Sequence, residues 1–199
     1  MSSVNVAAPT QLLWVLIGIV LTIGGTLLEA FIASPPWSWS QSGIYAYSLG
    51  VTWQVGAVLL VGCLGGKSAA AVSQIAYVLL GLTWFDVFAQ GGGLGYLLQP
   101  SFGYLLGFIP GAWICGWLAF RLPVRLEFLA LSCVFGLLTI HLTGVGYLLM
   151  AHLFQWASLS AVPFWQAFLT YSIHPLPGQL AIVCAVTVMS YILRHLMFY

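Results

Sequence analysis

The chain has 199 residues, of which 62% are hydrophobic and only 4% are charged. Soluble domains carry about 25% charged residues, so this composition excludes a water-exposed globular surface. The formal net charge of +1 also excludes a basic face for nucleic acid. Together with a mean hydropathy of +1.07, these values indicate a single polytopic membrane domain over residues 1–199. No room is left for a separate catalytic or ATP-binding domain.

Six apolar segments follow one another along the chain, and each is predicted to cross the bilayer as a helix. About 20 apolar residues span the hydrocarbon core, although the second segment is short for a full crossing. Continuous apolar runs do not show the alternation of β-barrel strands, which favours an all-α membrane fold. The first run is long enough to span and follows no basic segment, unlike a cleaved signal peptide. The segments are roughly 11–33, 49–66, 68–88, 101–120, 126–153 and 177–198.

The basic residues are distributed very unevenly among the predicted loops. Lys67 lies in the tight turn between the second and third segments, Arg121 and Arg125 lie between the fourth and fifth, and Arg194 lies near the C-terminus. With six spans, all of these positions fall on the same side as the N-terminus. The positive-inside rule therefore predicts that both termini are cytoplasmic. The opposite loops are rich in Trp, Tyr and Phe, which fits either an interfacial belt or the lining of a ligand site.

Small residues recur at every fourth position on the first segment, at Gly18, Thr22, Thr26 and Ala30. Small residues at this spacing let two membrane helices approach closely. The pattern is compatible with internal packing. Internal packing explains most such stripes; the alternative is a face that docks a partner membrane subunit, which requires the first helix to be peripheral.

The residues that usually carry catalysis or bind metals show no recognisable pattern. The four cysteines lie inside apolar runs with no CxxC pair, which favours a packing role. The four histidines share no helix face with a carboxylate, and no hydrolase motif is present. We therefore expect no metal site, no cofactor and no enzymatic activity.

Neutral polar residues collect instead in the half of the predicted bundle opposite to the basic residues. Donors and acceptors on helix ends, mixed with aromatic rings, are typical of a small-molecule pocket. The set comprises Thr52, Gln54, Gln90, Tyr96, Gln99, Tyr104, His174 and Gln179.

Three stretches are similar to the BioY family, the substrate-binding membrane subunits of energy-coupling-factor biotin transporters. The run GGGLGYLLQPSFGYLLGF over residues 91–108 resembles the family signature. Thr52-Trp53-Gln54 is similar to the family's Thr-Leu-Gln, and Pro175-Leu176-Pro177-Gly178 precedes the last segment as in the family. The resemblance extends from about residue 49 to the end of the chain.

The resemblance implies a six-helix subunit in a prokaryotic cell membrane that holds its vitamin near the outer face. It also implies partners, namely a coupling membrane protein with two ATPases, to which the small-residue stripe of the first helix would dock. The residues predicted to bind the substrate are Gln54, Gln90, Tyr96, Tyr104, His174 and Gln179.

Two positions differ from the family pattern. After Pro-Gly the family has Asp, and then Lys three residues later, which hold the ureido ring and the carboxylate. Here these positions are Gln179 and Ile182. Gln179 keeps an acceptor oxygen for a ureido N–H, whereas Ile182 offers no polar group. The ligand acid would then stay in water or contact His174 and tyrosine hydroxyls, unless the ligand is not biotin. The alternative function is a non-transporting membrane subunit that keeps the fold as an assembly element.

Overall fold

The computed structural model describes residues 8–156 and 162–197. In this part of the chain, five helical stretches are long and apolar enough to cross a membrane. The last stretch is composite, because a short helix and a π-helical turn precede its main helix. The elements are α1 (Ala8–Leu27), α3 (Gln54–Thr83), α4 (Phe102–Arg121), α5 (Leu126–Leu153), and α6 (Phe164–Phe168) continuing through η3 (Leu169–Ile173) into α7 (Leu176–Met197).

Helix α3 is divided by a sharp turn at Gly66, where φ is 78° and ψ is 172°. Only glycine adopts this conformation without strain, which explains why the predicted turn falls here. The two parts of α3 fold back on each other. As a result, Gln54 Nε2 near the start of α3 donates to the Tyr77 hydroxyl near its end at 2.9 Å. The turn packs against α4: a Cβ added to Gly116 would lie 2.6 Å from the Lys67 backbone nitrogen.

The first predicted span, 11–33, is not entirely helical. Helix α1 ends at Leu27, and Glu29–Ala33 forms strand β1. This strand pairs in antiparallel fashion with β2 (Ala46–Thr52), with Glu29 opposite Thr52. The prediction of helix at residues 29–33 and 49–52 was therefore wrong, because both segments are strands. Short apolar runs do not by themselves distinguish a helix from a strand.

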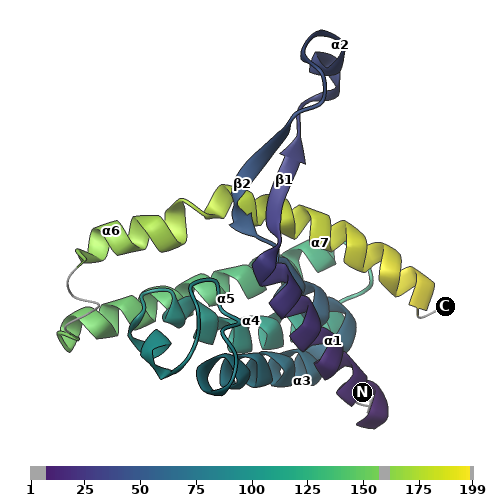
Figure 1. Ribbon diagram of the computed structural model, residues 1–199. Coiled ribbons are helices and arrows are strands. Elements are labelled where there is room, and N and C mark those ends of the chain that lie inside the picture. The colour runs from purple at the N-terminus through teal and green to yellow at the C-terminus, as the bar shows by residue number, and fades with distance from the viewer. Residues whose placement is uncertain (1–7, 157–161, 198–199) are drawn as a thin grey trace.

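The β-hairpin stands away from the helices and has a helical tip (Figure 1). The tip consists of a 3₁₀ turn, η1 (Pro36–Ser38), and the short helix α2 (Trp39–Ser42). At its base, the Ser48 hydroxyl donates to the Glu29 carboxylate across the two strands. The backbone N–H of Trp53 donates to the carbonyl of Leu28 at 2.9 Å, which ties the hairpin to the start of α3.

The small-residue stripe of α1 packs inside the molecule, against α3. A Cβ added to Gly18 would lie 2.6 Å from the Ser73 Cβ. Gln74 Nε2 donates to the Thr22 hydroxyl at 3.0 Å, and Thr26 Oγ1 lies 3.3 Å from the Tyr77 hydroxyl. Ala30, the fourth member, lies on β1 and is also buried. The chain itself covers these four residues, so the predicted use of this face for docking a partner does not agree with the structure.

Helix α4 lies between α3 and α5, and α7 packs across α3 and α5. Glycines permit the close approach of α4 and α5: a Cβ added to Gly107 would lie 2.7 Å from the carbonyl oxygen of Ile140. Because these helices are so close, polar residues on α4, α5 and α7 can meet directly at one end of the bundle.

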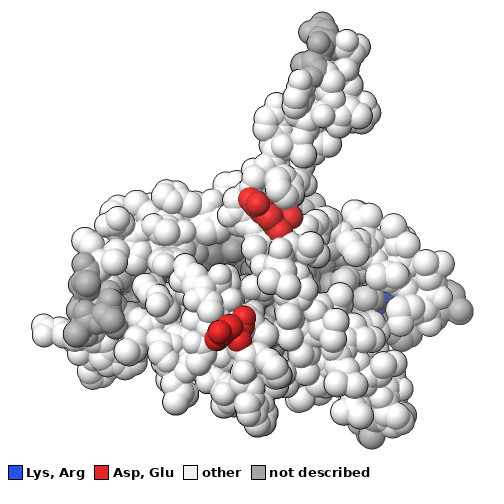
Figure 2. Space-filling view, viewed as in Figure 1, with Lys and Arg blue, Asp and Glu red and all other residues white. Residues whose placement is uncertain are grey.

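The basic residues gather at the other end of the bundle. Lys67 Nζ lies 5.7 Å from the Trp113 ring, and the Arg121 guanidinium lies 4.9 Å from the Trp117 ring. Arg194 on α7 donates to the Ala119 carbonyl at the end of α4 at 2.6 Å. On the face shown in Figure 2, acidic side chains form two patches, one of them at the hairpin base, and basic atoms are visible only near the C-terminal end of α7.

Candidate functional site

A polar cluster occupies the place where α4, α5, η3 and α7 meet. His141 Nε2 on α5 lies 2.7 Å from Gln179 Oε1 on α7. The Tyr104 ring on α4 packs edge-on against the His141 imidazole, with 5.7 Å between the ring centroids. The Tyr104 hydroxyl lies 2.6 Å from the Ser172 hydroxyl on η3. Four elements therefore contribute donors and acceptors to this cluster.

The backbone around the cluster sets the position of Tyr104. Gly144 lies one turn beyond His141 on α5, and a Cβ there would collide with the Tyr104 ring. Its lack of a side chain lets the ring lie flat against α5, beside the imidazole. On the other side, the Tyr171 ring lies 6.1 Å from the Tyr104 ring. Aromatic walls therefore flank the polar atoms.

His141 is buried in the cluster, with an exposed fraction of 9%. Gln179 Oε1 is an acceptor, so in this pairing the imidazole proton is on Nε2. The other ring nitrogen, Nδ1, is buried and has no hydrogen-bond partner among the described residues. The pair thus consists of one N–H donor, on His141, and one carbonyl acceptor, on Gln179, which are hydrogen-bonded to each other.

Tyr96 lies close to this cluster, on the 3₁₀ turn η2 (Leu94–Leu98) between α3 and α4. Its ring packs against Phe88, and its hydroxyl accepts hydrogen bonds from Ser101 Oγ at 3.2 Å and from the Gln90 backbone. Burial raises the pKa of the Tyr96 hydroxyl above its usual value, so this group is neutral at physiological pH. Tyr171 is near enough to interact electrostatically with the hydroxyls of both Tyr96 and Tyr104.

The structure does not bring all of the predicted site residues together. Tyr104 and Gln179 are in the cluster, and Tyr96 and the Gln90 backbone border it, whereas the Gln90 side chain is exposed. Gln54 belongs to a different network, because its amide donates to Tyr77, whose hydroxyl donates to the Val87 carbonyl at 3.0 Å. His174 is exposed at the end of η3.

Sequence reasoning missed His141 and Ser172 as members of the site. A usable signal existed for His141, since an ionisable residue inside an apolar span is expensive and is usually functional. Nothing in the local sequence distinguishes Ser172, because its role depends on the π-helical turn that directs its hydroxyl to Tyr104.

Ile182 lies one turn beyond Gln179 on α7 and is buried with an exposed fraction of 1%. It packs against α3, where a Cβ added to Gly56 would lie 2.7 Å from Ile182 Cγ2. It also lines a shallow apolar groove between α7 and the hairpin base. The groove residues are Phe31, Ile32, Leu49, Trp53, Ala181, Ile182 and Ala185. None of these groove residues carries a charged side chain that could hold a ligand acid.

Comparison with known proteins identifies relatives over most of the chain. The model of the BioY family matches residues 7–198. A "Probable biotin transporter BioY" from Lysinibacillus sphaericus is 40% identical over 102 residues, which cover 50% of this chain and 52% of that protein. The "Biotin transporter BioY" of Thermotoga maritima is 41% identical over 95 residues, covering 47% of this chain and 56% of that protein. The aligned segments thus span about half the length of these curated relatives.

A similar fold is found in a crystal structure at 2.1 Å of the S-component for biotin from an ECF-type ABC transporter. The TM-score is 0.66, and the superposition covers 98% of this chain and 95% of that chain. The sequence identity is 19%, so this similarity concerns the fold alone.

Proposed function

This chain belongs to the BioY family, and from that premise we propose that it is a membrane subunit that binds biotin, or a close relative of biotin, for uptake. The observation that carries the proposal is the His141–Gln179 pair, which lies between aromatic walls where α4, α5, η3 and α7 meet. The names of the relatives, which are biotin transporters, support the same ligand class.

The chemistry of the pair matches a ureido ring. Such a ring has a carbonyl acceptor beside N–H donors, so it can insert between the imidazole donor and the amide acceptor. The ureido carbonyl then accepts from His141 Nε2, and a ureido N–H donates to Gln179 Oε1. Each protein group exchanges one hydrogen bond for another, which avoids the cost of leaving a buried polar atom unpaired.

No fixed cation meets the ligand acid in this arrangement. Lys67, Arg121 and Arg194 are held at the opposite end of the bundle by contacts with α4. An unpaired carboxylate is costly to bury. We therefore place the acid at the mouth of the site, in water.

The proposal includes six membrane crossings, with the two parts of α3 counted separately and both termini in the cytoplasm. Two contacts support it. Trp14, near the start of α1, packs against Gly65 at the α3 turn, and Arg194, near the end of α7, contacts Ala119. The start of α1, the end of α7 and the basic residues thus share one end, which the positive-inside rule assigns to the cytoplasm of a prokaryotic cell. Energy would come from partners, a coupling membrane protein and two ATPases.

The direct test is a calorimetric titration of the purified protein with biotin, biotin amide and riboflavin. We expect saturable binding of biotin and biotin amide at one site per chain, and no binding of riboflavin. A protein that binds none of these molecules would instead favour the alternative of a non-transporting assembly subunit.

A further inference from the structure

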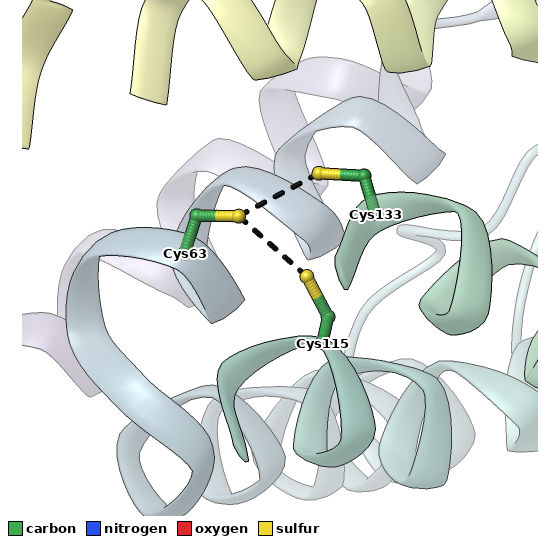
Figure 3. A group of neighbouring side chains, drawn as sticks. All are labelled: Cys63, Cys115 and Cys133. Atoms are coloured by element: carbon green, nitrogen blue, oxygen red, sulfur yellow. Dashed lines mark hydrogen bonds between the residues drawn. The ribbon is translucent and has the colours of Figure 1, made fainter. Parts of the chain in front are cut away.

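Three cysteines from three different helices meet in the interior of the bundle, as Figure 3 shows. Cys63 Sγ on α3 lies 3.6 Å from Cys115 Sγ on α4 and 3.5 Å from Cys133 Sγ on α5. All three sulfur atoms lie within 4.8 Å of one another, and all three residues are buried. The sequence spacing contains no sign of this cluster, because Cys63 is 52 residues from Cys115 and 70 residues from Cys133 in the chain, and the three converge only through helix packing.

Helix α7 closes the remaining side of this thiol cluster with polar groups. The Ser190 hydroxyl is fully buried and lies beside the Cys63 thiol, yet it makes no hydrogen bond of normal geometry within the described residues. Arg194, one turn further on, is close enough to interact electrostatically with Cys63. A cluster that served only for apolar packing would not require a buried hydroxyl and a guanidinium beside it.

The spacing of the sulfur atoms fits a metal ion with three thiolate ligands. With metal–sulfur bonds of about 2.3 Å, three sulfurs in a plane around one ion lie about 4 Å apart. The observed separations of 3.5 and 3.6 Å require only a small expansion. Among the described residues, no fourth His, Cys, Asp or Glu joins the group. Structural zinc is almost always four-coordinate, whereas soft thiolates select Cu(I), which accepts three ligands.

We propose that Cys63, Cys115 and Cys133 form a three-thiolate site for a single Cu(I) ion. Each thiol that becomes a ligand loses its proton on binding, and the proton is released to the solvent. Arg194 offsets part of the negative charge that develops on the sulfurs. Ser190 donates its hydroxyl proton to a thiolate sulfur, and this hydrogen bond orients the ligand.

The site has a short route to one end of the bundle. Cys63 lies three residues before Gly66, so about one helical turn separates it from the α3 turn. Cys115 directly precedes Gly116, which packs on the backbone of that turn. The ion therefore enters from the end of the bundle that carries the basic residues, where Arg194 lies. This end is distant from the proposed vitamin site, so the two sites can be tested separately.

The test uses the intact, reduced protein in detergent, titrated with Cu(I) in competition with the chelator bicinchoninate, with no vitamin present. We expect one Cu(I) per chain, thiolate-to-copper charge-transfer absorption, and an X-ray absorption spectrum with three sulfur neighbours. These signatures are measured on the wild-type protein and do not depend on whether a variant folds. A protein that fails to compete with the chelator, or that binds Zn²⁺ in preference to Cu(I), overturns the proposal.

Variants then assign the ligands. Cys63→Ser, Cys115→Ser and Cys133→Ser should each weaken Cu(I) binding by more than about a hundredfold, which exceeds the usual effect of an outer-shell change. Ser190→Ala should weaken it by about tenfold. Cys184→Ser is the matched control, because Cys184 is exposed on α7 and should leave binding unchanged. Retention of copper by the triple variant lacking all three buried thiols would contradict the assignment.

Discussion

The imidazole of His141 on α5 and the carboxamide of Gln179 on α7 are hydrogen-bonded at 2.7 Å, although 38 residues separate them in the chain. The bond joins two helices at the end of the bundle opposite to the basic residues. Because the donor and the acceptor satisfy each other, neither of these two side-chain atoms is left unpaired in the interior of the bundle. This relationship leads to the first two predictions.

Gln179→Leu should weaken the binding of biotin and biotin amide to the same extent. The variant removes the acceptor for a ureido N–H, and an unsatisfied buried polar group costs about 1–3 kcal/mol. That range corresponds to a loss of about fivefold to 150-fold in affinity. Calorimetric titration measures the effect, and Gln166→Leu on the exposed side of α6 is the matched control. Unchanged affinity in Gln179→Leu would remove this residue from the site.

Biotin amide should bind the native protein within about tenfold of biotin, a difference of about 1.4 kcal/mol. The reason is that Ile182 packs on Gly56 and carries no charge, so it forms no ion pair with the carboxylate of the ligand. In Ile182→Lys, the aliphatic stem can keep that apolar contact while the ammonium extends toward the acid. This variant should prefer biotin over its amide, and Ile182→Met serves as the uncharged control. A native protein that binds the acid a hundredfold more tightly would point to His174 or another donor.

Gly18→Ala should destabilise the fold through the contact of α1 with α3. The added Cβ would lie 2.6 Å from the Ser73 Cβ, and overpacking of this kind typically costs about 1–3 kcal/mol. Gly24 is on the same helix with no atom within 4 Å of an added Cβ, so Gly24→Ala should be neutral or stabilising. Thermal unfolding in detergent compares the two variants. Equal stability of both, with Gly18→Ala losing a partner protein, would restore the docking role of the stripe.

The two ends of the bundle should be accessible from opposite sides of the membrane. Ser40 lies on α2 at the hairpin tip, and Ser68 follows the α3 turn. In a Cys184→Ser background, a membrane-impermeant maleimide added to whole cells should label Ser40→Cys and should label Ser68→Cys only after lysis. The reverse pattern would invert the proposed orientation.

The sequence alone was sufficient for the class of fold and the approximate helix positions. The spans predicted at 101–120, 126–153 and 177–198 correspond to α4 (Phe102–Arg121), α5 (Leu126–Leu153) and α7 (Leu176–Met197), apart from residue 198, which lies outside the described residues. The reason is physical: in lipid, the backbone must satisfy its own hydrogen bonds, so a long apolar run implies a helix. The predicted BioY family was likewise confirmed by the family match over residues 7–198.

Only the tertiary structure decided which residues meet. The short apolar runs at residues 29–33 and 49–52 form a hairpin, in which the backbone groups of each strand are hydrogen-bonded to those of the other. The Gly18 stripe turned out to face α3, although its spacing also suits a partner protein. His141 and Gln179, like the three buried cysteines, are brought together by helix packing. Helical periodicity specifies one face of one helix, whereas a site depends on the distances between helices, and those follow from how all the side chains pack at once.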